Sequence, residues 1–306
     1  MPSRQAGLLA SAALLSFWTM TSFVEAQDAE VAATTTFIEG PTVDRAGNVY
    51  FSEIMAQRIL KLSPDGTLST YREKSNNANG LLIDPQGRLV ACEGATFTRN
   101  KVEARGIPRV TRTDLQTGKI EILIDSYEGA PLKGPNDVTI DGKGRLYFTD
   151  LSGGAVYRID GPGKAARILA GLGRPNGIVV SPDDTKLYVA DSFPVGEGMR
   201  VVHAYDLQPN GTATNHRIFY DFGNIRGIDG MSIDVQGNLY GAAGSLKGGQ
   251  LGVHVISPQG KLIKIIPIPE DPISNDTFGG PDMKTLYVTA GKSLYKIRND
   301  IAGLPR

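Results

Sequence analysis

The chain has 306 residues, and its 32 basic and 32 acidic residues give a formal net charge of zero. The charges are spread along the chain without a basic run, so no segment is built to neutralise phosphates and we expect no nucleic-acid partner. A single cysteine, Cys92, excludes an internal disulfide framework. Cys92 stands in the apolar run LVAC, where we expect a buried thiol.

Residues 1–26 are predicted to be a secretory signal peptide. Arg4 supplies a positive charge, Leu8 to Val24 is an apolar and small-residue stretch, and Val24-Glu25-Ala26 has the small residues of a cleavage site. The alternative is an uncleaved membrane anchor, but the stretch is short for a span and contains Ser and Thr. We therefore expect a secreted or periplasmic protein that has no membrane contact after cleavage.

One short cassette returns six times in the remainder of the chain. It consists of a polar residue, an apolar stretch, a turn of the Asp-Gly or Pro-Gly type and an apolar run led by Leu or Val and Tyr, which is typical of two short strands joined by a tight turn. Successive copies start 40 to 57 residues apart, at Glu39, Asn79, Asn136, Asn176, Asp229 and Asn275. A hairpin follows most copies, with a tip such as Asp65-Gly66. This spacing predicts an all-β chain in which residues 27–306 form a single six-bladed β-propeller domain.

The sixth copy is followed by too few residues for a complete blade. The β-branched segment from Thr34 to Phe37 precedes the first copy and has no blade of its own. We expect this N-terminal strand to complete the sixth blade and close the ring, which removes the open sheet edge. Insertions at 96–108, 126–133 and 193–199 are expected to form a rim or lid over the axial mouth. The sequence leaves open whether the insertion at 96–108 lines the pocket.

The opening residue of each cassette is the equivalent point of its blade, so the six opening residues are expected on one ring around the axis. Glu39 and Asp229 are carboxylates and Asn136 and Asn176 are carboxamides, and hard cations prefer such oxygen ligands. Converging carboxylates repel one another unless a cation neutralises them. We predict one divalent ion, Ca²⁺ first, with Zn²⁺, Mn²⁺ or Mg²⁺ as alternatives. The competing interpretation is that Asn or Asp before Gly only builds a turn.

Several segments resemble the gluconolactonase/senescence-marker-protein (regucalcin) family, and the resemblance runs from about Phe37 to Ile297. The segments are EGP at Glu39, CEG at Cys92, RVTRTD at Arg109, YEG at Tyr127, GPNDV at Gly134, RPNGI at Arg174, IDGMSID at Ile228 and FGGPDMKTLYVT at Phe278. The resemblance implies a six-bladed propeller with one divalent cation in its central channel and the hydrolysis of a small-molecule lactone or ester. It also matches Glu39, Asn176 and Asp229 to the family's metal ligands, and Asn136 to an Asn that faces metal and substrate.

The residues of the implied site suggest a mechanism of lactone hydrolysis. A cation would polarise the lactone carbonyl while a water attacks it. We expect Asp229 to be the general base and Glu39 to act only as a ligand. Asn136 would donate its amide N–H to the developing oxyanion or to the ring oxygen.

Five further residues are expected to bind substrate. Asn79 and Asn275 complete the ring, and Glu93 follows the end of a strand, where it would line the pocket by family analogy or lie on the surface. Animal members of the family carry an Arg two residues before the Asn that matches Asn136. Gly134 stands at that position here, so Arg99, Arg105 or Arg109 is expected to take over this contact, with Arg99 and Arg105 of the inserted loop favoured over Arg109.

Other residues give weaker indications of function. Arg109 is expected to be solvated, and His203, His216 and His254 are expected to form no catalytic dyad. A non-catalytic propeller that binds a ligand or protein around a structural ion is the alternative from another class. A third hypothesis is a metal-dependent hydrolase of another electrophile such as an organophosphate, because paraoxonases and diisopropyl fluorophosphatase use a similar ligand set. We expect a monomer or small homo-oligomer.

Overall fold

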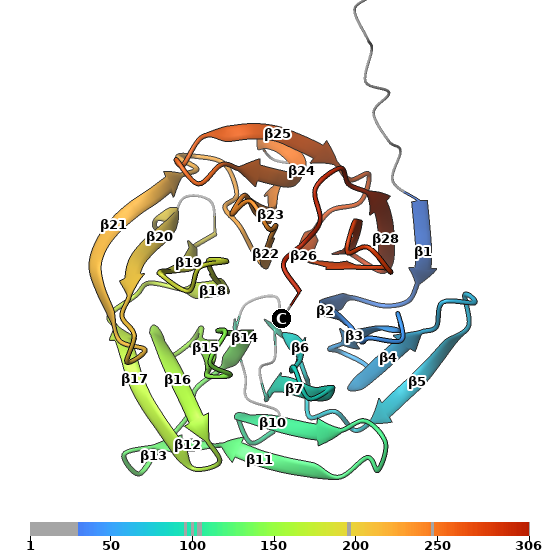
Figure 1. The fold of residues 1–306 in the computed structure, drawn as a ribbon, viewed down its shortest axis with the longest axis horizontal. Coiled ribbons are helices and arrows are strands. Elements are labelled where there is room, and N and C mark those ends of the chain that lie inside the picture. Colours follow the sequence, from blue (N-terminus) through green and yellow to red (C-terminus); the bar gives the residue numbers. More distant parts are fainter. Residues whose placement is uncertain are drawn as a thin grey trace, which may run out of the picture.

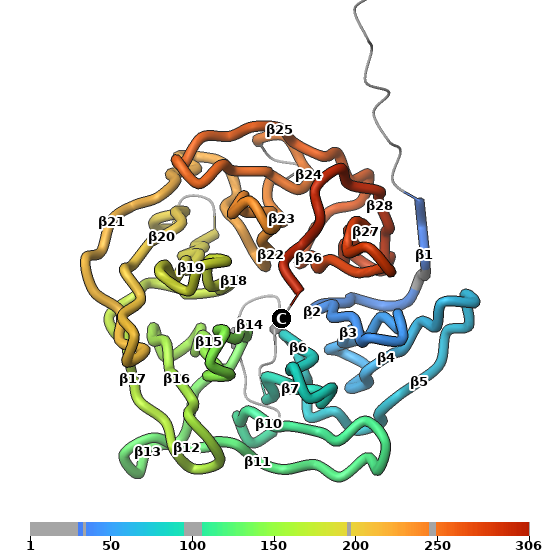
Figure 2. The backbone as a smooth tube through the Cα atoms, viewed as in Figure 1, coloured from blue at the N-terminus to red at the C-terminus, as the bar shows by residue number. Residues whose placement is uncertain are grey.

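The structure, a computed structural model, describes residues 30–94, 97–98, 101–102, 106–194, 197–245 and 248–305. These residues form a disc of six four-stranded antiparallel sheets arranged around an axis (Figure 1), which confirms the predicted all-β propeller. The tube in Figure 2 shows how the chain passes once around the disc, one sheet after another. The described residues include no helix with the length and hydropathy needed to cross a membrane.

Each blade runs from an innermost strand at the axis to an outermost strand at the rim. The first three blades are β2 (Ile38–Val43), β3 (Val49–Glu53), β4 (Arg58–Leu62) and β5 (Leu68–Glu73); β6 (Leu81–Ile83), β7 (Arg88–Glu93), β10 (Arg109–Asp114) and β11 (Ile120–Ile124); and β14 (Pro135–Ile140), β15 (Leu146–Asp150), β16 (Ala155–Gly161) and β17 (Lys164–Ala170). The next two are β18 (Pro175–Val180), β19 (Lys186–Ser192), β20 (Arg200–Leu207) and β21 (Ala213–Asp221); and β22 (Met231–Ile233), β23 (Leu239–Ser245), β24 (Gly248–Ile256) and β25 (Leu262–Pro267).

The sixth blade joins the two ends of the described chain. Its inner strands are β26 (Ile273–Gly279), β27 (Thr285–Ala290) and β28 (Ser293–Arg298), and its outermost strand is β1 (Glu30–Thr34), which pairs antiparallel with β28. The predicted closure by an N-terminal strand is confirmed, but the strand lies a few residues earlier than the expected segment from Thr34 to Phe37. Because β1 covers the free edge of β28, the disc is closed without relying on a disulfide.

A buried aspartate explains why the cassette has its particular residues. In the turn between β14 and β15, Asp141 Oδ1 accepts the backbone N–H groups of Lys143 and Arg145, both at 3.0 Å, while Oδ2 accepts the hydroxyl of Tyr147 at 2.9 Å. Asp44, Asp84 and Asp234 accept the equivalent pairs of backbone N–H groups in their own blades. Each side chain therefore fixes the tip of a hairpin and ties it to the following strand.

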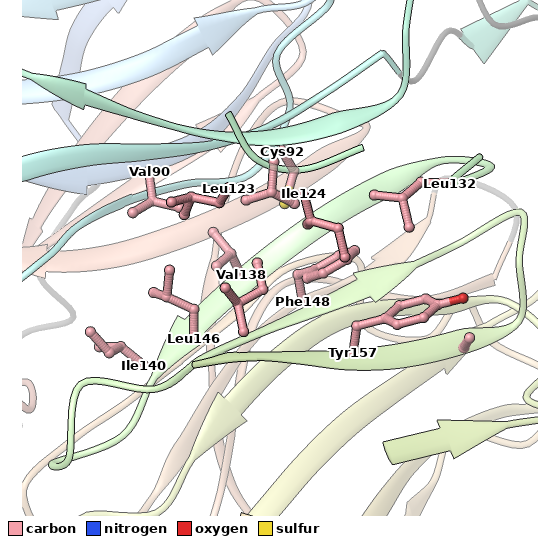
Figure 3. Close-up of a cluster of buried hydrophobic side chains, with 13 residues drawn as sticks. Val90, Cys92, Leu123, Ile124, Leu132, Val138, Ile140, Leu146, Phe148 and Tyr157 are labelled. Atoms are coloured by element: carbon pink, nitrogen blue, oxygen red, sulfur yellow. The ribbon is translucent and has the colours of Figure 1, made fainter. Parts of the chain in front are cut away.

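The apolar core is divided among the blade interfaces instead of forming one central mass. Six clusters of buried hydrophobic residues are present in the described part of the chain, one at each contact between neighbouring blades. Figure 3 shows the cluster between the second and third blades, where Cys92 and Leu123 face Val138 and Phe148. Burial raises the pKa of the Cys92 thiol well above its usual range. The expectation of a buried thiol is therefore confirmed.

The insertion at 126–133 is not a lid over the axis. It forms a small hairpin of β12 (Ser126–Tyr127) and β13 (Ala130–Pro131) at the outer rim of the disc (Figure 1). Tyr127 packs edge-on against Tyr157 with ring centroids 5.2 Å apart, and the Arg167 guanidinium lies 5.6 Å from the centre of the Tyr127 ring. The expectation that this insertion covers the mouth is wrong, because its aromatic side chain is held by the outer strands of the third blade.

The other two insertions fall partly outside the described residues. Within the insertion at 96–108, the structure describes two short paired strands, β8 (Phe97–Thr98) and β9 (Lys101–Val102). The C-terminal tail, in contrast, is described as far as residue 305 and ends near the axis (Figure 1). Leu304 donates its N–H to Ile233 O at 3.0 Å, which holds the tail against the innermost strand of the fifth blade.

Candidate active site

The six cassette-opening residues lie at or just before the starts of the innermost strands, which surround the axis (Figure 2). Five of them are buried, namely Glu39, Asn79, Asn136, Asn176 and Asn275. Asp229 is the exception, because 21% of its side chain is exposed. The ring is therefore enclosed by protein and opens to solvent beside Asp229.

The innermost strands are bulged at this level. One extra residue interrupts the pairing of β2 between Glu39 and Thr42, and equivalent irregularities occur in β14 between Pro135 and Val138 and in β18 between Pro175 and Ile178. β26 is irregular just before Asn275. A bulge redirects the side chains around it. The same irregularity therefore accompanies the ring position in four of the six blades.

Glycine follows four of the ring residues because neighbouring blades approach closely there. A Cβ on Gly40 would lie 2.2 Å from Asn79 O, and one on Gly177 would lie 2.7 Å from Asp229 O. Gly177 donates its N–H to that same oxygen at 2.7 Å. The interpretation of Asn-Gly as a mere turn therefore misses its role here, since Asn176-Gly177 lies within β18 and joins two blades.

Two hydrogen bonds connect the ring side chains to one another. Asn176 Nδ2 donates to Asp229 Oδ1 at 2.6 Å, and Asn275 Nδ2 donates to Glu39 Oε2 at 3.1 Å. Asn275 Oδ1 accepts the backbone N–H of Asp276 at 2.8 Å, so both ends of this carboxamide are engaged. The structure thus brings Glu39, Asn176, Asp229 and Asn275 together, and it uses Asn275 to orient Glu39.

Burial raises the proton affinity of both ring carboxylates, and neighbouring negative charge raises that of Glu39 further. Burial raises the pKa of Glu39 well above its usual range, and the nearby charges of Asp229 and Asp137 raise it further. Burial also raises the pKa of Asp229, although the Arg226 guanidinium opposes this increase. Two carboxylates held this close favour a cation between them, because a positive charge removes the repulsion.

The donor set fits a hard divalent cation. Glu39 and Asp229 supply carboxylate oxygens and Asn176 and Asn136 supply carboxamides, which are ligands that Ca²⁺ accepts. Asn79 is buried, and its Nδ2 has no partner among the described residues, so its N–H group is available to donate to a bound molecule and not to hold the ion. The described residues contain no group of three or more His, Cys, Asp or Glu side chains around one point, since half of this set is Asn.

Four charged residues beside the ring were missed by the sequence analysis. Asp137 and Asp276 stand where the other blades have glycine, and both are buried in the channel. Arg226 Nη2 lies 2.7 Å from Asp229 Oδ2, and the half-buried Arg174 also lowers the pKa of Asp229. The two aspartates could have been noticed as departures from the Gly of the repeat, but nothing in the sequence assigned the two arginines to the ring.

Glu93 is enclosed between the first and second blades. It is fully buried, accepts a hydrogen bond from the Thr111 hydroxyl at 2.6 Å and forms ion pairs with Arg72 and Arg109, both at 2.8 Å. The alternative of a surface carboxylate is therefore wrong, and so is the expectation that Arg109 is free in solvent. These contacts favour a structural role, and the substrate-binding role of Glu93 stays a prediction.

Of the other predicted site residues, the structure describes some and leaves others undescribed. Arg99 and Arg105 lie outside the described residues. Asn136 is buried at the ring, and its backbone oxygen accepts the Gly80 N–H at 2.8 Å. His203 Nδ1 lies 2.8 Å from His216 Nε2, a contact that the sequence did not predict, while the absence of a catalytic dyad stays a prediction. This pair belongs to β20 and β21, the two outer strands of the fourth blade, and is therefore set apart from the ring.

Comparisons of the sequence with known proteins agree with one another. The family model described as the SMP-30/Gluconolactonase/LRE-like region matches residues 37–292. A gluconolactonase of Zymomonas mobilis is 29% identical and aligns with 89% of this chain and 81% of its own length. A 6-deoxy-6-sulfogluconolactonase of Pseudomonas putida is 26% identical over 80% of this chain and 79% of its own.

Solved structures agree with the sequence relatives. A gluconolactonase of Xanthomonas campestris superposes with a TM-score of 0.76 at 27% identity, over 89% of this chain and 91% of that protein. A regucalcin of Agrobacterium tumefaciens shares the fold, with a TM-score of 0.71 at 18% identity over 92% and 98% of the two chains. Because the family model spans most of the chain, the resemblance noted from the sequence is confirmed: the protein belongs to the SMP-30/gluconolactonase/LRE-like family.

Proposed function

We propose that this protein is a divalent-metal-dependent lactone hydrolase that acts outside the cytoplasm. The lactonase relatives support the reaction class. The observation that carries the metal dependence is the convergence of Glu39 and Asp229, from blades that are not neighbours, on a ring shared with Asn176. The predicted signal peptide over residues 1–26 supports the location.

Glu39, Asn176, Asp229 and Asn136 would hold the ion. When bound, a divalent cation supplies a Lewis acid that polarises the lactone carbonyl and stabilises negative charge on its oxygen. Ca²⁺ is the first candidate, because every donor is an oxygen and the set carries two charges. Asn275 contributes by holding Glu39 in place through its 3.1 Å hydrogen bond.

Asp229 would transfer the protons, and Asn136 would donate a hydrogen bond to the oxyanion. Asp229 accepts a proton from the attacking water as the new carbon–oxygen bond forms. The ring carbon–oxygen bond then breaks, and the alkoxide leaving group takes a proton to give a hydroxy acid. Asp229 suits the base role, because it is the most exposed member of the ring and Arg226 counteracts the rise in its pKa.

The substrate we propose is a small lactone with several hydroxyl groups. Arg174 and Arg226 bring positive charge to the exposed side of the ring, next to Asp229. Such groups donate hydrogen bonds to hydroxyl and carboxyl oxygens. They offer a replacement for the arginine that Gly134 leaves out, in addition to the loop arginines Arg99 and Arg105.

The test is an assay of purified protein on glucono-, aldono- and aliphatic lactones, with and without chelator. We expect turnover that chelator abolishes and added Ca²⁺ restores. Asp229→Ala should lose metal binding and turnover together. Asp229→Asn should keep part of the metal binding and lose about 10²-fold or more in kcat.

The matched control is Asp282→Asn. Asp282 is an exposed carboxylate in the turn between β26 and β27, where it pairs with Arg298. Its substitution should leave metal binding and turnover unchanged. Metal binding without turnover on any lactone would instead favour the non-catalytic binding propeller. Parent activity in Asp229→Asn would remove the base assignment while leaving the metal site. Secretion is checked separately, by N-terminal sequencing of exported protein, which should begin at Gln27.

A further inference from the structure

A second group of acidic residues lies deeper in the axial channel than the ring. A cavity of about 120 Å³ is lined by residues that follow the ring positions along the innermost strands, and Leu304 of the C-terminal tail also lines it. Asp137 and Asp276 contribute carboxylates to this cavity, and Ser232 and Asn275 contribute a hydroxyl and a carboxamide. None of the described lining residues is basic.

Asp137 and Asp276 come from opposite blades, the third and the sixth, and face each other across the axis. Both side chains line the same cavity, and Asn275 Nδ2, from the residue before Asp276, lies 3.5 Å from Asp137 Oδ2. Asp137 Oδ1 accepts the Val138 N–H at 3.0 Å. Its neighbours on both oxygens are therefore N–H donors, which suit an ionised carboxylate.

Asp276 has a buried oxygen that the described chain leaves unsatisfied. Its Oδ1 accepts the Ser232 hydroxyl, while its Oδ2 has no hydrogen-bond partner. The residue is only 3% exposed, so bulk water does not solvate that atom. A protonated Oδ2 would be a donor without an acceptor, and an ionised Oδ2 would be a charge without a partner. Either form is costly when buried.

Most other buried carboxylates of this protein have a basic partner or hydrogen bonds on both oxygens, as Asp234 has. Glu53 is paired with Arg58, Glu93 with Arg72 and Arg109, and Asp141 with Arg145. Asp137 and Asp276 form no ion pair with any described residue. The fold thus places two buried acids in a cavity with no basic side chain, and the cavity has room for an ion with a few waters.

We propose that Asp137 and Asp276 form a second cation site, for an ion of the Ca²⁺ type, in the axial cavity next to the ring. Carboxylate and hydroxyl oxygens are ligands that such an ion takes. The ion would bind Asp276 Oδ2 and Asp137 and so join the third and sixth blades across the disc. This site is separate from lactone chemistry, since the general base and the exposed opening belong to Asp229.

The test counts calcium ions. Purified protein is stripped with chelator, exchanged into buffer at neutral pH and titrated with CaCl₂ by calorimetry. We expect two ions per chain for the parent, one for Asp276→Asn and one for Glu39→Gln. Asp282→Asn, an exposed carboxylate, should still bind two. One ion per chain in the parent, or two in Asp276→Asn, would overturn the second site.

A second measurement covers the case in which Asp276→Asn does not fold. In the Glu39→Gln background, CaCl₂ should still raise the Tm, because the second site is intact; no rise would overturn the proposal. Crystals of the parent soaked in TbCl₃ should show an anomalous peak between Asp137 and Asp276, and a peak at the ring alone would contradict it. Two ions without lactone turnover would leave this inference standing and remove the proposed function.

Discussion

Asn176 and Asp229 are 53 residues apart in the chain, yet Asn176 Nδ2 lies 2.6 Å from Asp229 Oδ1. The residue after Asn176 adds a main-chain contact to the same partner, since Gly177 N donates to Asp229 O at 2.7 Å. The fourth and fifth blades are thus joined at the ring by both a side-chain and a main-chain hydrogen bond. The position of Asp229 is therefore set by its neighbour blade as much as by its own.

Gly177→Ala should separate these two blades. The added Cβ would lie 2.7 Å from Asp229 O, a distance that real Cβ atoms essentially never show, so the backbone must shift. We expect a loss of about 1–3 kcal/mol in the free energy of unfolding, together with weaker calcium binding, because Asp229 moves with the backbone. Urea denaturation and calcium titration measure the two effects.

Gly161→Ala is the matched control for that substitution. Gly161 lies in a hairpin of the third blade, and a Cβ there would meet no atom within 4 Å. Its substitution should leave calcium affinity unchanged. Equal calcium affinity in the two variants would show that the close approach at Gly177 does not position the ring.

Glu93→Gln should lower stability without changing substrate binding. The substitution removes the negative charge that compensates the buried Arg72, and breaking such a pair from one side costs about 3–5 kcal/mol. Because Glu93 is enclosed by Arg72, Arg109 and Thr111, KM should stay at the parent value. The exposed pair of Arg112 and Glu121 provides the control, since Glu121→Gln should change stability by no more than about 1 kcal/mol. A raised KM with parent stability would restore the substrate-binding role of Glu93.

The fold could be predicted because the repeat encodes it locally. Asp141 and Tyr147 are six residues apart and specify one hairpin by their own hydrogen bonds, and the same spacing occurs at Asp44 and Tyr50. The insertion at 126–133 was misplaced for the opposite reason. Its position depends on the contact of Tyr127 with Tyr157, which no local pattern announces.

The site could be predicted only in part. Equivalent repeat positions must share a ring, so the convergence of Glu39, Asn176 and Asp229 follows from the repeat itself. Arg226 could not be assigned, because its contact with Asp229 depends on the course of the loop before β22. The ion pair of Glu93 could not be foreseen for a related reason, since its partner Arg72 comes from the preceding blade.

The chelated protein should become less stable as the pH rises towards neutrality. Burial raises the pKa of Asp137 to about 7, whereas the unfolded chain has the ordinary value near 4. Between these values the folded state holds a proton that the unfolded state has released, so the free energy of unfolding falls with pH, by up to about 1.4 kcal/mol per pH unit for one group. Urea denaturation in chelator at several pH values measures the slope.

Asp137→Asn tests the origin of that slope. The variant cannot ionise at this position, so its stability should fall less steeply between about pH 4 and 7, the limits set by the ordinary and raised pKa values. Carboxylates with lowered pKa values, such as those of Glu53 and Asp141, change stability mainly at lower pH and do not interfere. The same slope in parent and variant would assign the effect to another group.

Arg226→Gln should shift the pH dependence of hydrolysis. Arg226 Nη2 lies 2.7 Å from Asp229 Oδ2, and its charge opposes the rise in pKa that burial imposes on Asp229. Without that charge the pKa of Asp229 increases, so a larger fraction of the base is protonated at low pH. The acidic limb of kcat/KM should therefore move to higher pH, with a loss of about tenfold or more at pH 6 that becomes smaller towards pH 8.

Two further variants separate this electrostatic effect from a structural one. Arg226→Lys keeps the charge but loses the hydrogen bond to Ile273 O, so it should keep the acidic limb near the parent position even if kcat falls. Arg298→Gln removes an arginine from an exposed pair with Asp282 and should leave the profile unchanged. If Arg226→Gln lost the same fraction of activity at every pH, Arg226 would act by holding the loop in place and not through the charge of Asp229.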